Sequence, residues 1–317
     1  MSTYLIKRLL MVFPTVFGAV TLVFFAIHLA PGDPIALYIP PDFPVDASPE
    51  RIAELRARVG LDRPLHVQYV SFIAGIFQGD LGTSLHHRNP VAVGLLERLP
   101  ATLELGILSL AIAVVLGVTV GIVSAIRRGT WLDNVAMTLA LFGVSIPNFW
   151  LGMLLMQLVG LHWPILPPSG FGGSIFTAEG LRFALLPAIT IGISGAGGLA
   201  RYTRSSMLDV LNEDYVRTAR SKGLSERIVV YKHALRNALI PIITLLGLSF
   251  GSMLSGAVIV ETVFGWPGLG RYLVTGISNR DFPVVQGVVL VIAVGFVLAN
   301  LITDLIYGFV DPRIRYE

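Results

Sequence analysis

Long apolar segments alternate with shorter polar ones along most of the chain. The six that are long and apolar enough to suggest membrane spans are residues 9–30, 101–126, 131–159, 184–200, 239–260 and 284–309. An α-helix rises about 1.5 Å per residue, so about 20 residues cross the roughly 30 Å hydrocarbon core of a bilayer. The fourth segment is the shortest, and we expect its helix to continue beyond the membrane to Met207. The pattern predicts an all-α polytopic membrane protein with six transmembrane helices.

The first apolar segment invites comparison with a secretory signal peptide, because Lys7 and Arg8 precede it. The apolar core of a signal peptide usually has about 7–15 residues, and residues 9–30 form a longer run. We therefore expect an uncleaved first span, with Pro14 tolerated or bending the helix near its start.

A mixed, polar segment, residues 31–100, separates the first span from the rest. It opens with Pro-Gly-Asp-Pro, RIAELRARV at residues 51–59 predicts a short helix, and GDLGTSLHHRNP at residues 79–90 predicts a loop. We divide the chain into an N-terminal end with the first span (1–30), a small external segment (31–100) and a five-helix core (101–317). The core includes a cytoplasmic loop, residues 201–238.

The distribution of basic residues predicts which segments lie on the cytoplasmic side of the membrane. Most of the 23 Lys and Arg residues fall at the N-terminus, around residues 127–128, in the loop 201–238 and at the C-terminus. Cytoplasmic loops of membrane proteins carry such an excess. Both termini are therefore predicted to be cytoplasmic.

Composition narrows the function classes. With 54% hydrophobic and 14% charged residues and a mean hydropathy of +0.75, the chain is too apolar for one soluble domain and has membrane lipid as a partner. The absence of cysteine excludes disulfides, thiolate chemistry and cysteine metal sites. A net charge of +3 without a basic patch predicts no nucleic-acid partner.

No motif predicts a catalytic or metal site. The chain has neither G-x-x-x-x-G-K-[ST] nor a concentrated set of carboxylates or histidines. His86 and His87 are adjacent and could touch a metal, but ordinary surface histidines are the simpler interpretation. Residues 195–200 fit the dinucleotide pattern G-x-G-x-x-A, yet they lie in an apolar run with no strand before them, so helix packing is favoured. Gly117-x3-Gly121 and Gly247-x3-Gly251 favour the same interpretation.

Polar residues inside apolar segments are costly against lipid and so carry information. Ser145 and Asn148 interrupt the third segment, where they either line a solute path or bond between helices. Asn300, Thr303 and Asp304 stand in the sixth, and Asp304 is placed to pair with a basic residue near the cytoplasmic end.

The longest polar stretch between spans, residues 201–241, predicts two helices joined at a glycine. Asn212 or Asp214 can cap the first helix, and Gly223 can end it in a left-handed conformation, with Leu224 packing back on Ala219. Ser225 can cap the second helix. From the pattern alone, such a stretch is most often just a solvated cytoplasmic loop, and that interpretation is favoured.

Within this stretch, DYVRTARSKGL followed by HALRNALIP resembles the cytoplasmic loop of ABC importer permeases of the dipeptide, oligopeptide and nickel branch. The resemblance extends from KRLLMVFPTVFGAVTLVFFAIHLAPGDP to DPRIRY. The broader importer signature begins Glu-Ala-Ala, whereas this chain has Arg217, Thr218 and Ala219, so only the last Ala and Gly223 match it. In that family the glycine-ended helix is the coupling helix, which docks on the ATPase. The resemblance thus assigns ATPase coupling to Asp214, Tyr215, Arg217, Thr218, Ala219, Lys222, Gly223 and Leu224.

The resemblance also implies partners and a location. The chain would pair in the bacterial cytoplasmic (inner) membrane with a second, homologous permease subunit, two ATPase subunits and an external solute-binding protein. It would hold no cofactor and would not itself be an enzyme, since ATP and Mg belong to the partner ATPases. Its substrate would be a di- or oligopeptide, or alternatively a nickel chelate or glutathione. Two more distant alternatives are a secondary transporter, which would more typically show an inverted repeat, and an integral membrane enzyme, which would need clustered acidic or histidine residues.

Overall fold

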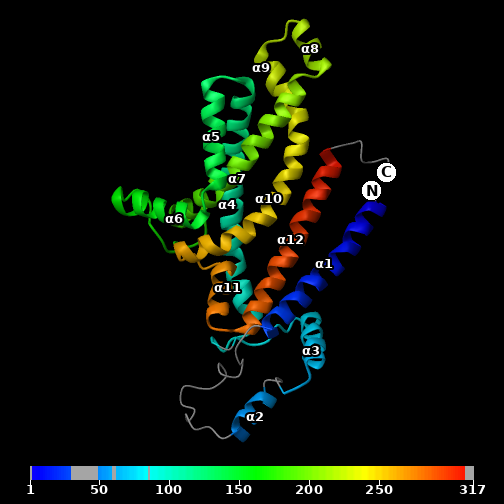
Figure 1. Cartoon of the computed structure of the whole chain (residues 1–317), viewed down its shortest axis with the longest axis vertical. Coiled ribbons are helices and arrows are strands. Elements are labelled where there is room, and N and C mark those ends of the chain that lie inside the picture. The colour runs from blue at the N-terminus through cyan, green and yellow to red at the C-terminus, as the bar shows by residue number, and fades with distance from the viewer. Residues whose placement is uncertain (1, 30–48, 59–61, 85, 311–317) are drawn as a thin grey trace.

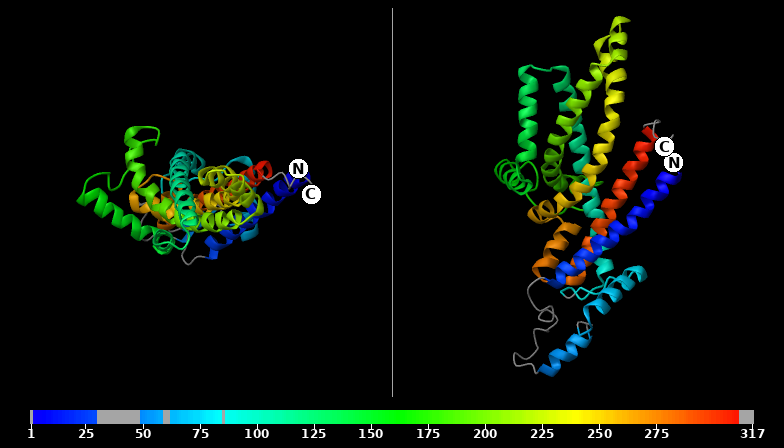
Figure 2. Two further views of the ribbon diagram at one scale, coloured as in Figure 1. Left: turned by 90° about the horizontal axis from the view of Figure 1, so that it is seen from above. Right: turned by 45° about the vertical axis from the view of Figure 1, so that its right-hand side comes forward.

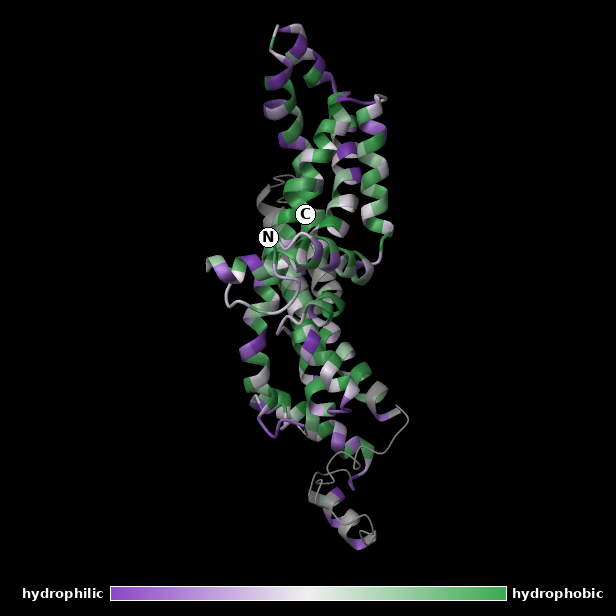
Figure 3. Ribbon diagram, turned by 90° about the vertical axis from the view of Figure 1, so that its left-hand side faces the viewer, coloured by the Kyte–Doolittle hydropathy of each residue, from purple (hydrophilic) through white to green (hydrophobic). Residues whose placement is uncertain are grey.

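The computed structural model describes residues 2–29, 49–58, 62–84 and 86–310, and these residues are almost entirely helical. Within them no strand occurs beyond an isolated bridge between Thr83 and Pro90. The molecule is elongated, with α8 at one end and α2 and α3 at the other (Figure 1). Polar residues gather at both ends and apolar ones between them (Figure 3).

Twelve α-helices and two π-helical segments, η2 and η3, follow one another in the described residues. They are α1 (Ser2–Leu29), α2 (Pro49–Arg58), α3 (Leu65–Gln78), α4 (Val91–Ile126), α5 (Trp131–Ser145), α6 (Asn148–Leu155), η2 (Met156–His162), α7 (Ala178–Leu211), α8 (Asp214–Ser221), α9 (Glu226–Ile228), η3 (Val229–Ala234), α10 (Leu235–Phe264), α11 (Leu269–Ser278) and α12 (Phe282–Val310).

Within the described residues, each predicted apolar segment is largely helical, but the third is not one straight span. By length and composition, α4, α7 and residues 282–303 of α12 can each cross a membrane, and α5 with α6 and η2 forms a fourth candidate bent by 104°. The bend lies at Ile146 and Pro147. Pro147 lacks an amide hydrogen and forces the residue before it out of the helical conformation. The interruption expected within residues 131–159 is therefore a sharp bend between two helices.

The second and fourth spans are longer than predicted. Helix α4 begins at Val91 rather than Ala101, because Val91, Leu95 and Leu99 continue its apolar face and pack with Leu269 and Val284. Helix α7 likewise runs from Ala178 to Leu211.

Helices α4 and α7 form the central pair of the molecule. A Cβ on Gly117 would lie 2.8 Å from Leu199 Cβ, and one on Gly121 would lie 2.5 Å from Thr203 Cβ. Such contacts explain why glycine is needed at both positions and confirm that Gly117-x3-Gly121 packs within the subunit. Gly197, in the dinucleotide-like pattern, faces the Ala140 carbonyl of α5. The side chains of residues 247–251 lie outside those described.

The remaining long helices pack beside this pair and against one another. Helix α5 contacts α7, α10 contacts both α7 and α12, and α12 contacts α1. The start of α1 and the end of α12 both point towards the end of the molecule that carries α8 (Figures 1 and 2). At the opposite end α3 joins α1 through an aromatic cluster, in which the Tyr69 ring lies 5.2 Å from that of Phe24.

The short helix α11 makes a tightly packed corner between α10 and α12. Glu261 is fully buried there. Its carboxylate accepts hydrogen bonds from Thr102 Oγ1 (2.7 Å) and from the backbone amide of Arg271 (3.1 Å). Trp266 is also fully buried, and its Nε1 donates to the Ala101 carbonyl over 2.9 Å. The aromatic, glycine-rich stretch after α10 is thus a packed corner.

A second buried carboxylate fixes the loop 79–90 to this corner. Ser84 Oγ donates to Asp281 Oδ2 over 2.6 Å, and the His86 amide donates to the same oxygen over 3.2 Å. The contact joins segments nearly 200 residues apart, before α4 and before α12.

Candidate functional site

Helix α8 is amphipathic, and its exposed side faces away from the protein. Val216 and Ala219 are buried against Val229 of η3. The residues predicted to contact an ATPase are otherwise exposed: Asp214, Tyr215, Arg217, Thr218, Lys222, Gly223 and Leu224. Ala219 differs from them, since it is 6% exposed and supports the helix from beneath.

The start of α8 differs from the sequence prediction. Its N-cap is Glu213, which makes no side-chain hydrogen bond to the helix. Asn212 instead donates from Nδ2 to the Leu208 carbonyl over 2.9 Å, at the end of α7. Asp214 lies in the first turn, where its negative charge favours the positive end of the helix.

The end of α8 confirms the predicted glycine-terminated helix. Gly223 has φ 76°, a left-handed conformation that glycine adopts without the Cβ clash of other residues. The Gly223 amide donates to the Arg220 carbonyl over 2.9 Å, and the Leu224 amide donates to the Ala219 carbonyl over 3.4 Å. These two hydrogen bonds form a Schellman motif.

Two exposed hydrogen bonds join α8 to the helices that follow the glycine. Arg220 Nε donates to Glu226 Oε1 over 2.7 Å, which joins the last turn of α8 to α9. Asn237 Nδ2 donates to Tyr215 Oη, also over 2.7 Å, which joins α8 to α10. The predicted second helix follows as α9, η3 and α10 without a break, and Ser225 is its N-cap without a side-chain hydrogen bond.

The other predicted site residues lie elsewhere, at the bend between α5 and α6. Ser145 is exposed and Asn148 is half-buried, and the Asn148 Oδ1 atom is buried with no hydrogen-bond partner. The structure does not bring this bend near α8, which lies at the end of the molecule (Figure 1).

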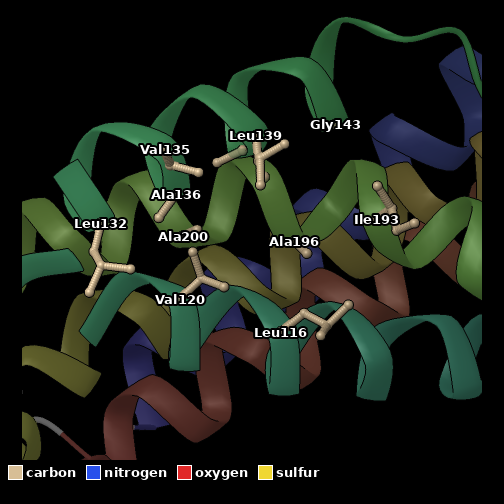
Figure 4. A pocket seen from close by; sticks show the side chains of 12 residues that line it. Leu116, Val120, Leu132, Val135, Ala136, Leu139, Gly143, Ile193, Ala196 and Ala200 are labelled. Atoms are coloured by element: carbon tan, nitrogen blue, oxygen red, sulfur yellow. The ribbon is translucent and has the colours of Figure 1, made fainter. Parts of the chain in front are cut away.

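An apolar pocket of about 340 Å³ lies between α4, α5 and α7. Side chains from all three helices point into it (Figure 4). Its lining is Leu, Val, Ile, Ala and Gly, and includes neither Ser145 nor Asn148. The pocket therefore offers no side-chain polar group to orient a peptide.

A charged pair between α5 and α7 was missed by the sequence analysis. Arg204 Nε and Nη2 donate to the two carboxylate oxygens of Asp133, each over 2.7 Å. Ser124 Oγ and the Gly129 amide donate to the same carboxylate, which is 2% exposed. The available signal was an acidic residue inside the apolar segment 131–159, a position where charge is costly without a partner.

The polar residues of the sixth predicted span show no common site. Thr303 Oγ1 donates to the Ala299 carbonyl over 2.7 Å within α12, and Asn300 Oδ1 is buried without a partner. The Asp304 side chain lies outside those described. Among the described residues, no three His, Asp or Glu side chains gather to hold a metal ion.

Comparison with known protein families decides what kind of protein this is. Residues 117–316 match the family model described as the binding-protein-dependent transport system inner membrane component, and residues 1–106 match the N-terminal model of such membrane components. The chain belongs to this family. It is a membrane component of a binding-protein-dependent ABC importer, so the resemblance seen in the sequence is confirmed.

Curated relatives align with this permease from end to end. It is 46% identical over 317 residues to the glutathione transport system permease protein GsiC of Salmonella choleraesuis (strain SC-B67), covering 100% of both chains. It is 42% identical over 341 aligned residues to the dipeptide transport system permease protein DppB of Escherichia coli (strain K12), again covering 100% of both.

Solved structures confirm the fold of this permease. A chain of the inward-facing MetNI methionine ABC transporter superposes with a TM-score of 0.59 and 16% identity, covering 69% of this chain and 96% of that one. A second crystal form of the same transporter gives a TM-score of 0.55. At this identity the likeness carries the fold alone.

Proposed function

We propose that this permease carries short peptides into the cell. The relatives aligned over its whole length are named for a dipeptide and for glutathione, which are both short peptides. It would work with a second permease subunit, two ATPase subunits and an external solute-binding protein. A nickel chelate is the alternative solute. Identifying what the co-purified binding protein carries, and which labelled solute reconstituted vesicles take up, separates these possibilities.

Helix α8 would be the element that docks on the ATPase. The observation that carries this proposal is an exposed short helix at the tip of the molecule, ended by Gly223 with positive φ and braced by Val229, Glu226 and Asn237. The bracing matters because a docking element transmits force only if it is fixed to the helices behind it. The α8 end is then cytoplasmic, and both termini lie on that side.

The solute path would run by the bend at Pro147. Asn148 Oδ1 is an unpaired acceptor there, and Ser145 is exposed beside it. ATP-driven closure of the ATPases would pull α8 and open this path outward. The solute-binding protein would then release its cargo into it.

Replacing Gly223 by Val tests the docking role. We expect a local cost on the order of 1 kcal/mol or more, since a β-branched residue disfavours positive φ. Uptake should fall, with less ATPase co-purifying or with ATP hydrolysis disconnected from uptake.

Gly79→Val is the matched control. Gly79 also ends a helix with positive φ (74°), but at the opposite end of the molecule, and neither glycine has an atom within 4 Å of an added Cβ. Its substitution should leave ATPase attachment and coupling unchanged. Normal, fully coupled uptake by the Gly223→Val transporter would show that α8 is only a connection.

A further inference from the structure

The ion pair between Asp133 and Arg204 joins two parts of the permease at the end that carries α8. Asp133 lies in the first turn of α5, and Arg204 lies on α7. The guanidinium binds both carboxylate oxygens, each over 2.7 Å. A two-point contact of this kind fixes orientation as well as distance.

The Asp133 carboxylate also accepts hydrogen bonds from the end of α4 and from the turn between α4 and α5. Ser124, in the last turn of α4, donates through Oγ, and Gly129 donates its amide over 2.9 Å. Thr130 caps α5 by accepting a hydrogen bond from the Asp133 amide. One buried side chain therefore holds the end of α4, the turn and the start of α5 against α7.

Helix α7 leads directly from this pair to α8. It continues from Arg204 to Leu211, and only residues 212 and 213 separate it from the start of α8. Any displacement of α8 is therefore delivered to α7 close to Arg204.

Beside the apolar pocket between them, close contacts at two glycines limit how far α4 and α5 can slide on α7. Gly121 of α4 admits Thr203, the neighbour of Arg204. Gly143 of α5 lies against Ile193, with 3.1 Å between its ideal Cβ and that carbonyl. Packed interfaces of this kind move as units rather than deform continuously.

We propose that Asp133 and Arg204 are positioning residues that make the α4–α5 hairpin move together with α7 and α8. The inference rests on the proposed function, because it requires α8 to be the docking helix. The unit formed by the α4–α5 hairpin, α7 and α8 ends at the 104° bend after Ser145, beyond which α6 takes another direction. The ion pair thereby carries motion from α8 to the bend that we propose as the solute path.

The first test measures solute transported per ATP hydrolysed by the whole transporter in proteoliposomes. Asp133→Asn and Arg204→Gln should each lower this ratio by about fivefold or more, the lower range of typical coupling between sites. The double variant should be no worse than either single variant, because both remove one contact. Arg204→Lys keeps the charge but loses the two-point geometry and should fall between.

Asp209→Asn is the matched control. It removes a carboxylate from an exposed position on the same helix, between the ion pair and α8, and should keep the wild-type ratio. Wild-type ratios in the Asp133 and Arg204 variants would overturn the proposal. If Asp133→Asn does not assemble, Arg204→Lys carries the test.

The second test measures the motion itself. The chain has no cysteine, so spin labels can be placed through Arg128→Cys at the hairpin turn and Ser221→Cys on α8, with cysteine-free partner subunits. In the otherwise unchanged permease the label distance should stay constant between nucleotide-free and ATP-bound states. With Asp133→Asn it should change on ATP binding. An equal change in both would overturn the proposal.

Co-purification of the ATPase separates this inference from the proposed function. Asp133→Asn should retain the ATPase, because it leaves the exposed surface of α8 intact. If Gly223→Val is fully coupled while Asp133→Asn is not, the docking role of α8 fails. If Gly223→Val disconnects hydrolysis while the Asp133 variants stay coupled, the ion pair alone fails.

Discussion

Two regions of the permease, the α8 end and the α11 corner, each bury a carboxylate, but they satisfy it in different ways. At the α8 end, Asp133 is paired with the guanidinium of Arg204, which is itself partly exposed. At the α11 corner, Glu261 is fully buried and accepts from neutral donors, Thr102 Oγ1 and the Arg271 amide. The first is a charged contact between helices that remain separate elements. Glu261, in contrast, is enclosed by the α11 corner, and it binds a backbone amide of that corner.

The difference indicates how each end is built. Gly268 and Gly270 lie so close to Glu261 that an added Cβ on either would crowd its carboxylate. The α11 corner therefore depends on tight packing around a buried carboxylate, whereas α8 is held by a small apolar contact, Val216 and Ala219 against Val229, and by a few exposed polar contacts. We expect substitutions in the corner to lower the stability of the permease markedly. Substitutions on α8 should change its stability little, even where they impair transport.

Glu261→Ala should have the largest effect on stability. It leaves Thr102 Oγ1 and the Arg271 amide without their acceptor, at about 1–3 kcal/mol for each buried unsatisfied group, or about 2–6 kcal/mol in all. The measurement is thermal unfolding of the purified transporter in detergent, followed by tryptophan fluorescence, since Trp266 is buried beside this site. If Glu261→Ala lowers stability no more than a substitution of an exposed glutamate does, the α11 corner is not more tightly built than the α8 end.

Gly268→Ala should have an intermediate effect. Its added Cβ would meet the Glu261 carboxylate, and overpacking of this kind costs about 1–3 kcal/mol. Gly198→Ala is the control, because no atom lies within 4 Å of a Cβ there and alanine favours the helix. The same unfolding assay should show a loss at residue 268 and no loss at residue 198. Equal stability of the two variants would mean that the corner is looser than the contacts indicate.

Glu226→Ala should have the smallest effect. It breaks the pair with Arg220 at the α8 end, where the Glu226 side chain is 65% exposed. Exposed ion pairs contribute about 0–1 kcal/mol, so the unfolding temperature should barely change and raised salt should remove the difference. Arg220→Ala and the double variant complete a cycle that isolates the pair. A coupling energy well above 1 kcal/mol would show that this end is braced as strongly as the corner.

Much of the fold could be predicted from the sequence because long hydrophobic segments directly indicate membrane helices. The helices, the glycine end of α8 and the Gly117-x3-Gly121 contact follow from local pattern. Local pattern also contained the bend at Pro147, which was expected only as an interruption. The early start of α4 could have been found from the four-residue spacing of Val91, Leu95 and Leu99.

The partners of buried polar groups could not be predicted. Asp133 and Arg204 are 71 residues apart, and Thr102 and Glu261 are 159 residues apart. One sequence does not show which helices become neighbours, so it cannot show which charges meet. For the same reason the N-cap of α8 was misassigned, since Asn212 could bond to the α7 carbonyl behind it as readily as to the helix ahead. The predicted roles of Ser145, Asn148 and the α8 surface stay predictions.

The contact between Ser84 and Asp281 has a consequence for how the chain is made. During synthesis Ser84 emerges long before Asp281, with which it shares a hydrogen bond across 197 residues. Helix α1 also packs mainly on α12, the last helix of the described chain. The first helix and the loop before α4 therefore have to wait in the membrane and at its surface until translation is nearly complete. Contacts of such high sequence separation form slowly and leave apolar surfaces open meanwhile. We therefore expect that a truncated product lacking α12 leaves α1 without its main packing partner and is prone to degradation.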